Sequence, residues 1–289
     1  MQTFLPFADF LRSADVLDDR RLGKQRVETL QILRALHCEG YGWANHPAVT
    51  MWQGHTPALV CYGTAMVDEW EARGFDDTTR TSIAEFVHPI APRTQTQLAR
   101  EDRLPRWLGR EPLHRSHRSA LLRKDPEHYG RWFQADTPAD LEYVWPVPPE
   151  PRGAQPGSGR RTAWVVRGEM GDDEVAVEAR AGEELWVPLD ARSGRIPKRA
   201  RQVARLVDEM APGDLLVVPH DRTLRVGEIA GDHRMKGGRH VRPVRWIGVL
   251  DRPALRFPAA LQDPQVVFAL HDEPAVARLR RRHPTDATK

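Results

Sequence analysis

Residues 146–161 read PVPPEPRGAQPGSGRR, and this stretch divides the chain. Proline, glycine and serine dominate it, and no apolar periodicity survives across it. We therefore predict a flexible linker over residues 148–161, between an amino-terminal domain of residues 1–147 and a carboxy-terminal domain of residues 162–289. A chain of 289 residues exceeds the usual size of a single domain, which agrees with this division.

Helical periodicity governs the amino-terminal domain. Leucine and valine side chains recur on one face over residues 14–35, which predicts one long helix there. The opposite, polar face carries Arg20, Lys24, Glu28 and Gln31. Further helices are expected over residues 56–72 and 113–123, because turn and breaker residues follow both. The sequence thus predicts an all-α amino-terminal domain.

In the carboxy-terminal domain the helical spacing of apolar residues gives way to short strand-like runs. Short runs rich in Val, Trp and Leu are separated by Gly, Pro and Asp: TAWVVRG, EVAVEA, ELWVPL, DLLVVP, LRVGEIAG and VRPVRWIGVL. An amphipathic helix is expected over residues 197–210, and a last short helix ends near residues 278–282. We predict a β-rich domain, a small curved sheet or open barrel with helices packed on it. The whole chain is then a two-domain α+β protein.

Charge and cysteine content narrow the class of protein. The chain has 43 basic and 40 acidic residues and a pI near 9.1, which permits a polyanionic partner without requiring one. Two cysteines, Cys38 and Cys61, are too few for a zinc-finger set and predict buried thiols in a reducing cytoplasm. No apolar run approaches a membrane span of about 18 residues. We expect a soluble, cytoplasmic protein without a membrane partner.

The helix expected over residues 113–123 is the centre of a basic region. Residues 91–124 hold nine Arg or Lys against three acidic residues. The densest part carries His114, Arg115, His117, Arg118 and Lys124. Such a helix can contact consecutive DNA phosphates, although a solvated helix face would have the same composition. No third ligand accompanies the two histidines, so no metal site is predicted.

The stretch LDDRRLGKQRVETLQIL, residues 17–33, suggests chemistry. Lys24 and Glu28 are four residues apart, so they either form an exposed ion pair or present an amine and a carboxylate to one groove. Excision of a base through an imine needs both groups. In the second reading, the neighbouring Arg20, Arg21 and Arg26 hold phosphates.

The segment NHPAVTMWQGH adds candidates for base contact. It contains His46, Trp52 and His55, and aromatic side chains beside basic ones can stack on a flipped or exposed base. The alternative is that Trp52 belongs to the core and His55 precedes the next helix.

The amino-terminal domain resembles the pyrimidine-dimer DNA glycosylase family, which includes phage endonuclease V, over nearly its whole length. The matching stretches are MQTF, LDDRRLGKQR, MWQGHTPALVCYG, EWEARGF and SHRSALLRKDPEHYGRWF. In that family the chain's own α-amino group attacks C1′ of the damaged nucleoside, and a helical carboxylate just after an arginine assists. The resemblance therefore implies that the amine of Met1 is a nucleophile, with no cofactor.

Two positions depart from the family pattern. Gln2 is too bulky for efficient removal of the initiator methionine, so the terminal amine is that of Met1. An alignment through DRRL places Arg21 where the family has its catalytic glutamate. Asp18, Asp19 or Glu28 could substitute, and we favour Glu28 because it shares a helix face with Lys24. The candidate catalytic residues are Met1, Lys24 and Glu28.

Residues 162–272 resemble the PUA-like, EVE-related domain that precedes the nuclease in Mrr-type restriction enzymes. WVVRGE, GDLLVVPHDRTLRVGEIAGDH and RHVRPVRWIGVL carry the likeness. Such folds are similar to readers of modified bases, which implies a pocket for an extruded base. The candidates for its walls are Trp164, Arg167, Asp232 and Trp246. The residues that could follow the phosphate backbone are Arg195, Lys198, Arg199, Arg201, Arg234, Lys236 and Arg239.

These features favour a DNA glycosylase, with or without abasic-site lyase activity, that excises damaged or modified bases from double-stranded DNA in repair or in defence against phage. A second hypothesis is a non-catalytic binding protein for modified DNA on a degenerate glycosylase scaffold. A third is an RNA enzyme or RNA-binding protein, because PUA-like folds also serve RNA. The sequence indicates neither the target base nor the oligomeric state.

Overall fold

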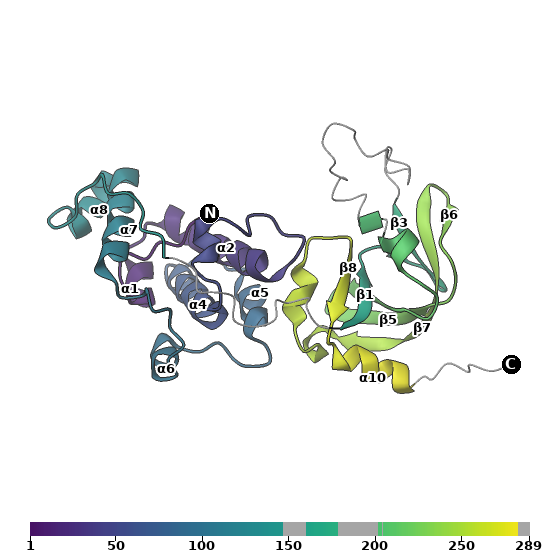
Figure 1. Ribbon diagram of the computed structural model, residues 1–289. Coiled ribbons are helices and arrows are strands. Elements are labelled where there is room, and N and C mark those ends of the chain that lie inside the picture. Colours follow the sequence, from purple (N-terminus) through teal and green to yellow (C-terminus); the bar gives the residue numbers. More distant parts are fainter. Residues whose placement is uncertain (147–159, 179–201, 204, 283–289) are drawn as a thin grey trace. The chain divides into compact units, whose positions relative to one another are not determined.

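The computed structural model describes residues 1–146, 160–178, 202–203 and 205–282 (Figure 1). The chain forms two compact units, Met1–Gly153 and Ala154–Lys289, whose border lies within the segment 148–161. Unit 1 is helical and unit 2 is built on a β-sheet, so the predicted two-domain α+β class is confirmed. Within the described ranges, no helix combines the length and apolar character needed to cross a bilayer.

Unit 1 combines three long helices with shorter ones. In chain order they are α1 (Phe10–Asp15), α2 (Asp19–His37), α3 (Pro47–Thr50), α4 (Thr56–Ala72), α5 (Arg80–Ala84), the 3₁₀ turn η1 (Glu85–Val87), α6 (Gln95–Arg100), α7 (Glu111–Lys124) and α8 (Pro126–Phe133). The long ones are α2, α4 and α7. α4 coincides with the helix predicted over residues 56–72, and α7 contains the one predicted over residues 113–123.

The single helix predicted over residues 14–35 is wrong at its start, because Asp18 interrupts it: α1 ends at Asp15, and α2 begins at Asp19. The side chain of Asp9 caps α1 by accepting from the backbone N–H of Arg12, and Asp18 caps α2 by accepting from that of Arg21. A side-chain acceptor at the N-cap satisfies a backbone donor that a helix start leaves open. The apolar periodicity continues across this break and therefore conceals it.

The core of unit 1 lies between α1, α2 and α4, where Phe10, Trp52 and Tyr62 are fully buried. Cys38 and Cys61 are buried free thiols, as predicted. Burial raises the pKa of Cys61 to about 12, so this thiol stays protonated and is no nucleophile.

The described residues of unit 2 form one eight-stranded sheet. Its strands are β1 (Arg161–Val166), β2 (Glu169–Met170), β3 (Glu174–Glu178), β4 (Leu215–His220), β5 (Thr223–Ile229), β6 (Arg234–Lys236), β7 (Arg239–Asp251) and β8 (Val267–His271). The described part of unit 2 also contains the π-helical turn η2 (Arg205–Glu209), the 3₁₀ turns η3 (Arg252–Ala254) and η4 (Pro258–Gln262), and α10 (Pro274–Arg282).

The strand order is β2-β3-β7-β5-β4-β1-β8, with β6 added beside β7. Neighbours run antiparallel except β1 and β4, which are parallel. Five of the predicted strand runs coincide with β1, β3, β4, β5 and β7, whereas ELWVPL lies outside the described residues. β8 was not predicted. Of the helix expected over residues 197–210, the described part is residues 202–203 and η2.

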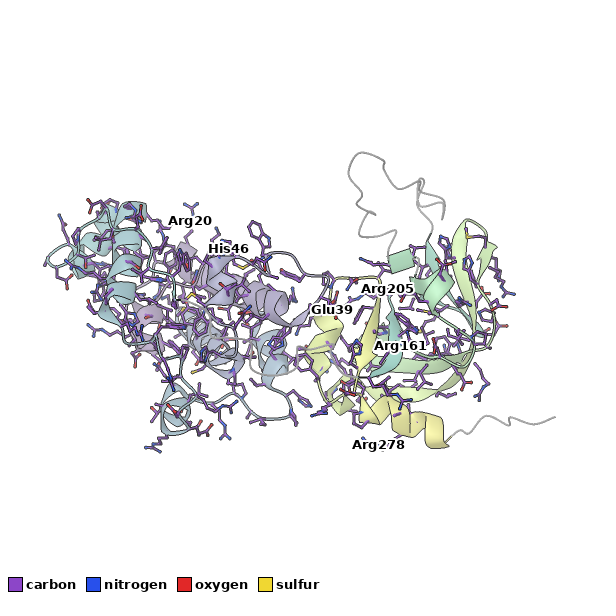
Figure 2. All side chains as sticks on the ribbon, in the orientation of Figure 1. Arg20, Glu39, His46, Arg161, Arg205 and Arg278 are labelled. Carbon is purple, nitrogen blue, oxygen red and sulfur yellow. The ribbon has the colours of Figure 1, made fainter. Side chains whose placement is uncertain are left out.

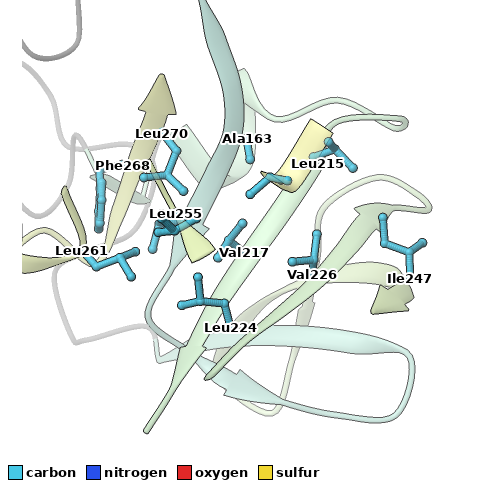
Figure 3. Packing of buried hydrophobic residues seen from close by; sticks show 12 residues of the cluster. Ala163, Leu215, Val217, Leu224, Val226, Ile247, Leu255, Leu261, Phe268 and Leu270 are labelled. Carbon is cyan, nitrogen blue, oxygen red and sulfur yellow. The ribbon is translucent and has the colours of Figure 1, made fainter. Parts of the chain in front are cut away.

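Apolar side chains cover both faces of this sheet. Along β4, Leu215 and Val217 pack on one face with Leu261 of η4 and Phe268 of β8 (Figure 3). Leu216 and Val218 point to the opposite face, where they join a second cluster that includes Leu206 of η2. Both faces of β4 are therefore buried, which explains why its sequence is a continuous apolar run instead of an alternating one.

Candidate active site

The first residues of the chain lie between α2 and α7. The backbone N–H of Phe4 donates to Oε1 of Gln25 on α2 at 2.8 Å. On the other side, Nδ1 of His117 accepts from the N–H of Leu5 at 3.2 Å, and Nδ1 of His114 lies 2.8 Å from the carbonyl oxygen of Leu5. Side chains thus replace the neighbouring strand that an extended segment normally needs, because its buried peptide groups require partners.

This anchoring brings the start of the chain to a carboxylate. The backbone N–H of Gln2 donates to Oε2 of Glu28 at 3.2 Å, and Nε2 of Gln25 donates to the same oxygen at 3.2 Å. Successive backbone nitrogens are at most about 3.7 Å apart, so the α-amino group of Met1 lies within roughly 7 Å of Glu28. An amine and a carboxylate therefore share one site.

Electrostatic interactions place two further residues at this site. His46, the N-cap of α3, has a lowered pKa because of burial and of the α-amino group, while Glu28 acts in the opposite direction. Burial raises the pKa of Tyr143, and the side chain of Gln2 acts in the opposite direction. Both residues therefore lie within electrostatic reach of Glu28, and sequence reasoning had missed Tyr143.

Lys24 and Arg20 continue the exposed face of α2 away from Glu28. Each step of four residues is about one helical turn, or roughly 5.4 Å, and both side chains are exposed. In the view of Figure 2, Arg20 and His46 lie on the side of unit 1 where the chain begins. Arg20 and Lys24 therefore form a cationic row on α2 that ends next to Glu28, where they could contact the phosphates of a bound strand.

The comparison with protein families agrees with this geometry. Residues 1–82 match the family model for pyrimidine dimer DNA glycosylases. The matched segment contains the start of the chain, Glu28 and His46, but neither α7 nor unit 2. The search of curated proteins and the search of solved structures gave no match. The PUA-like resemblance of residues 162–272 therefore stays a prediction.

Three of the α7 residues predicted to contact phosphates are buried instead, and that prediction is wrong. Burial lowers the pKa of His117 to about 3 and also lowers that of His114, so both imidazoles are neutral beside the backbone of Leu5. Arg118 donates to the carbonyl of Pro6 at 3.0 Å and pairs with Glu111. α7 therefore holds the amino-terminal segment in place, although α7 itself lies outside the matched residues 1–82. Arg115 and Lys124 remain exposed.

Two of the arginines on α2 have structural partners, which corrects their predicted contact with phosphates. Arg21 pairs with Asp18 at 2.6 Å and donates to the carbonyl of Lys124 at 3.0 Å. Arg26 pairs with Asp77, and its guanidinium lies 4.3 Å from the ring centroid of Trp70. Both side chains are largely buried, so among the three arginines considered for this role only Arg20 projects into solvent.

Trp52 cannot stack on a base, because it is fully buried and donates from Nε1 to Thr3 Oγ1 at 3.1 Å. The alternative reading, a core residue, is correct. His55 is half-buried at the N-cap of α4, and burial lowers its pKa. The exposed tryptophan of this region is Trp43, at 64% exposure. Its surroundings, YGWANHP, are turn-forming and polar, which was the available signal.

In unit 2 the four residues predicted for a modified-base pocket do not come together. Trp164 and Trp246 contribute to the core on one face of the sheet. Arg167 donates to the carbonyls of Leu261 and Asp263, and Leu261 belongs to the core on the opposite face. The side chain of Asp232 is 95% exposed. The sheet separates these groups because successive residues of β1 point to opposite faces.

Trp164 does line a pocket, with different neighbours. The walls are Arg160, Arg161, Thr162, Ala163, Trp164, Asp214 and Leu215. Trp164 donates from Nε1 to Asp214 at 3.0 Å, and the guanidinium of Arg161 lies 4.5 Å from its ring centroid. This pocket presents cations beside an indole and a carboxylate.

The seven cations of unit 2 that were predicted to follow the phosphate backbone either form ion pairs or lie outside the described residues. Arg234 and Lys236 both pair with Glu174, at 3.0 and 2.8 Å, and Arg239 pairs with Glu169. Arg195, Lys198, Arg199 and Arg201 lie outside the described residues. Across the ranges that the structure describes, no group of three or more His, Cys, Asp or Glu side chains could hold a metal ion.

Proposed function

We propose that unit 1 is a DNA glycosylase that excises a base through an amine nucleophile, either the α-amino group of Met1 or Lys24. The observation that carries this is the hydrogen bond from the backbone N–H of Gln2 to Glu28, which fixes the start of the chain beside a carboxylate. The family match over residues 1–82 includes both partners.

In the proposed reaction, the unprotonated amine attacks C1′ of the target nucleotide and the bond to the base breaks. The base leaves with a proton, the sugar ring opens, and the product is an imine between protein and DNA. Glu28 stabilises the positive charge at C1′ and moves protons between the amine and the sugar oxygen. Hydrolysis of the imine releases an abasic site, whereas elimination before hydrolysis cuts the strand.

Borohydride trapping tests the chemistry. Borohydride reduces the imine to a stable amine, so wild-type protein mixed with an abasic duplex should give a covalent adduct. Glu28→Gln keeps an acceptor for Gln2 but cannot take up a proton, and we expect at least a ~100-fold slower trapping rate. Glu39→Gln, which changes an exposed carboxylate just beyond α2, is the matched control and should trap at the wild-type rate.

Peptide mapping of the adduct separates the two nucleophiles. An adduct on the first residue supports the α-amino group, and an adduct on Lys24 supports the lysine. At neutral pH α-amino groups are unprotonated in a far larger fraction than lysine side chains, which favours the α-amino group. Tight DNA binding without any adduct would instead support the non-catalytic hypothesis. Preference for structured RNA over duplex DNA at physiological salt would support the third.

For unit 2 we propose a reader of damaged or modified DNA at the pocket that Trp164 lines. Arg160 and Arg161 are the phosphate contacts in this proposal, and Asp214 accepts from Trp164 at the pocket wall. Arg161→Ala should weaken binding to all duplexes and reduce the salt dependence of the affinity. A glycosylase with such a reader would serve in DNA repair or in defence against phage with altered bases.

A further inference from the structure

Trp43 is an exposed aromatic residue in a strained backbone conformation. Its φ of 72° is in the left-handed region, which is unfavourable for a bulky side chain, and 64% of its surface is exposed. The carbonyl of Trp43 accepts from the N–H of His46 at 2.8 Å, so a tight turn holds it. An exposed residue in such a strained conformation adds nothing to the hydrophobic core, and residues of this kind are concentrated at active sites and ligand-binding sites.

Trp43 is the outer end of a row of rings. The ring centroids of Trp43 and His46 are 5.7 Å apart, those of His46 and Trp145 6.4 Å, and those of Trp145 and Tyr143 5.3 Å. The two contacts of His46 are edge-on, with interplanar angles of 71° and 84°. Neither is a parallel stack, so the exposed indole of Trp43 has room for a flat partner. We call these four residues the Trp43 surface.

The Trp43 surface adjoins the proposed reaction centre. The rings of Tyr143 and His117 have centroids 5.4 Å apart, and His117 accepts from the backbone N–H of Leu5, in the same amino-terminal segment whose Gln2 N–H donates to Glu28. His46 experiences the charges of both the α-amino group and Glu28. A flat group stacked on Trp43 would therefore lie on the same side of unit 1 as the amine that attacks C1′.

We propose that the Trp43 surface stacks on a nucleobase that has left the duplex. The inference rests on the proposed function and adds its substrate class, a nucleotide whose base is out of the helical stack. Charge favours this occupant over an apolar peptide, because exposed Lys24 and Arg20 continue from Glu28 along α2 and suit a flanking phosphate chain. Every base offers a π-face, so stacking on indole needs no particular base.

A comparison of two duplexes tests the inference. One is fully paired, and the other carries a single bulged 2-aminopurine, an unpaired fluorescent base. Wild-type protein should bind the bulged duplex more tightly and quench the 2-aminopurine. Trp43→Ala should weaken binding of the bulged duplex by about 5- to 150-fold, the range expected from loss of one stacking contact. Trp43→Phe, which keeps a ring, should retain most of the preference.

Trp132→Ala is the matched control, because Trp132 is a 48% exposed tryptophan of the same unit on α8, outside the Trp43 surface. It should bind both duplexes as the wild type does. The inference is overturned if wild-type protein does not prefer the bulge, or if Trp43→Ala keeps the preference. Trapping of wild-type protein on abasic DNA is a separate measurement. If trapping fails, the glycosylase proposal is refuted and the stacking result still stands. If the preference for the bulged duplex fails, the stacking inference is refuted and the trapping result still stands.

Discussion

Gln25→Leu should release the amino-terminal segment from α2. The Gln25 side chain is fully buried, and its Oε1 accepts from the N–H of Phe4 at 2.8 Å and from the hydroxyl of Tyr62 at 2.7 Å. Its Nε2 donates to Glu28 at 3.2 Å. Leucine has a similar volume, so the substitution removes three hydrogen bonds and leaves little cavity.

The size of the expected loss in unfolding free energy depends on which groups lose their hydrogen-bond partners. The Tyr62 hydroxyl retains the carbonyl of Phe4 at 2.9 Å, so its loss is small. The N–H of Phe4 stays buried without an acceptor, at a cost of about 1–3 kcal/mol, and the half-buried bond to Glu28 contributes about 1 kcal/mol more. Removing a buried amide offsets part of this. We expect the free energy of unfolding of unit 1 to fall by about 2–3 kcal/mol.

The cysteines provide an assay specific for unit 1. The chain has two, Cys38 and Cys61, both buried and both in unit 1. Pulsed thiol labelling against urea therefore reports the unfolding of unit 1 alone. With a slope of about 2 kcal/mol per molar urea, the midpoint of Gln25→Leu should fall by about 1–1.5 M. The folded variant should also trap abasic DNA more slowly, because the amine and Glu28 lose their shared anchor.

Gln31→Leu is the control, since this half-exposed glutamine lies further along the same helix and should change stability by less than about 0.5 kcal/mol. Equal midpoints for Gln25→Leu and wild-type protein would refute the anchoring role of Gln25. A lowered midpoint with an unchanged trapping rate would refute the link from this anchor to the chemistry.

Three further predictions concern stability. Burial lowers the pKa of His117 from 6.5 to about 3, so between these values the unfolded chain binds one more proton. Unit 1 should therefore lose up to about 1.4 kcal/mol per pH unit as the pH falls, and His117→Asn should lower that slope in acid titrations. Gly63→Ala would place a Cβ 2.6 Å from Cγ2 of Thr29 and should cost about 1–3 kcal/mol in urea unfolding; adding Thr29→Ser, which removes that methyl, should restore most of it. In unit 2, the buried guanidinium of Arg242 donates to four backbone carbonyls. Arg242→Met leaves these carbonyls without a donor and should lower the free energy of unfolding by about 3–5 kcal/mol. A thermal unfolding curve like that of the wild type would contradict this.

Local signals allowed much of the fold to be predicted. α4 carries Pro57 in its first turn and Gly74 just after its end, and both signals act within a few residues of the helix termini. The runs at β4 and β5 are apolar and bounded by Gly, Pro or Asp, so their strands were found. β8 was missed, because a short apolar run does not by itself distinguish a strand from a buried helix.

The candidate site was predicted only in part, because its contacts join distant parts of the chain. Glu28 was identified from its helix face and its partner was not, since Gln2 lies 26 residues away. His114 and His117 resembled a solvated basic face, whereas their partner is the backbone of Leu5, 109 and 112 residues distant. Nothing in the local sequence indicates such a contact. Trp43 differs, because its turn-forming, polar surroundings were a local signal of exposure, whereas Trp52 is core.

The hydrogen bonds between Leu5 and two histidines of α7 have a consequence for the folding and the production of the protein. Leu5 is synthesised long before α7 and gains its partners His114 and His117 only once that helix exists, so we expect this contact to be among the last of unit 1 to form. A fragment that stops at residue 82 would leave that opening segment without half of its supports. A tag fused ahead of Met1 would also displace the amine, so recombinant protein for activity assays needs its tag at the opposite end.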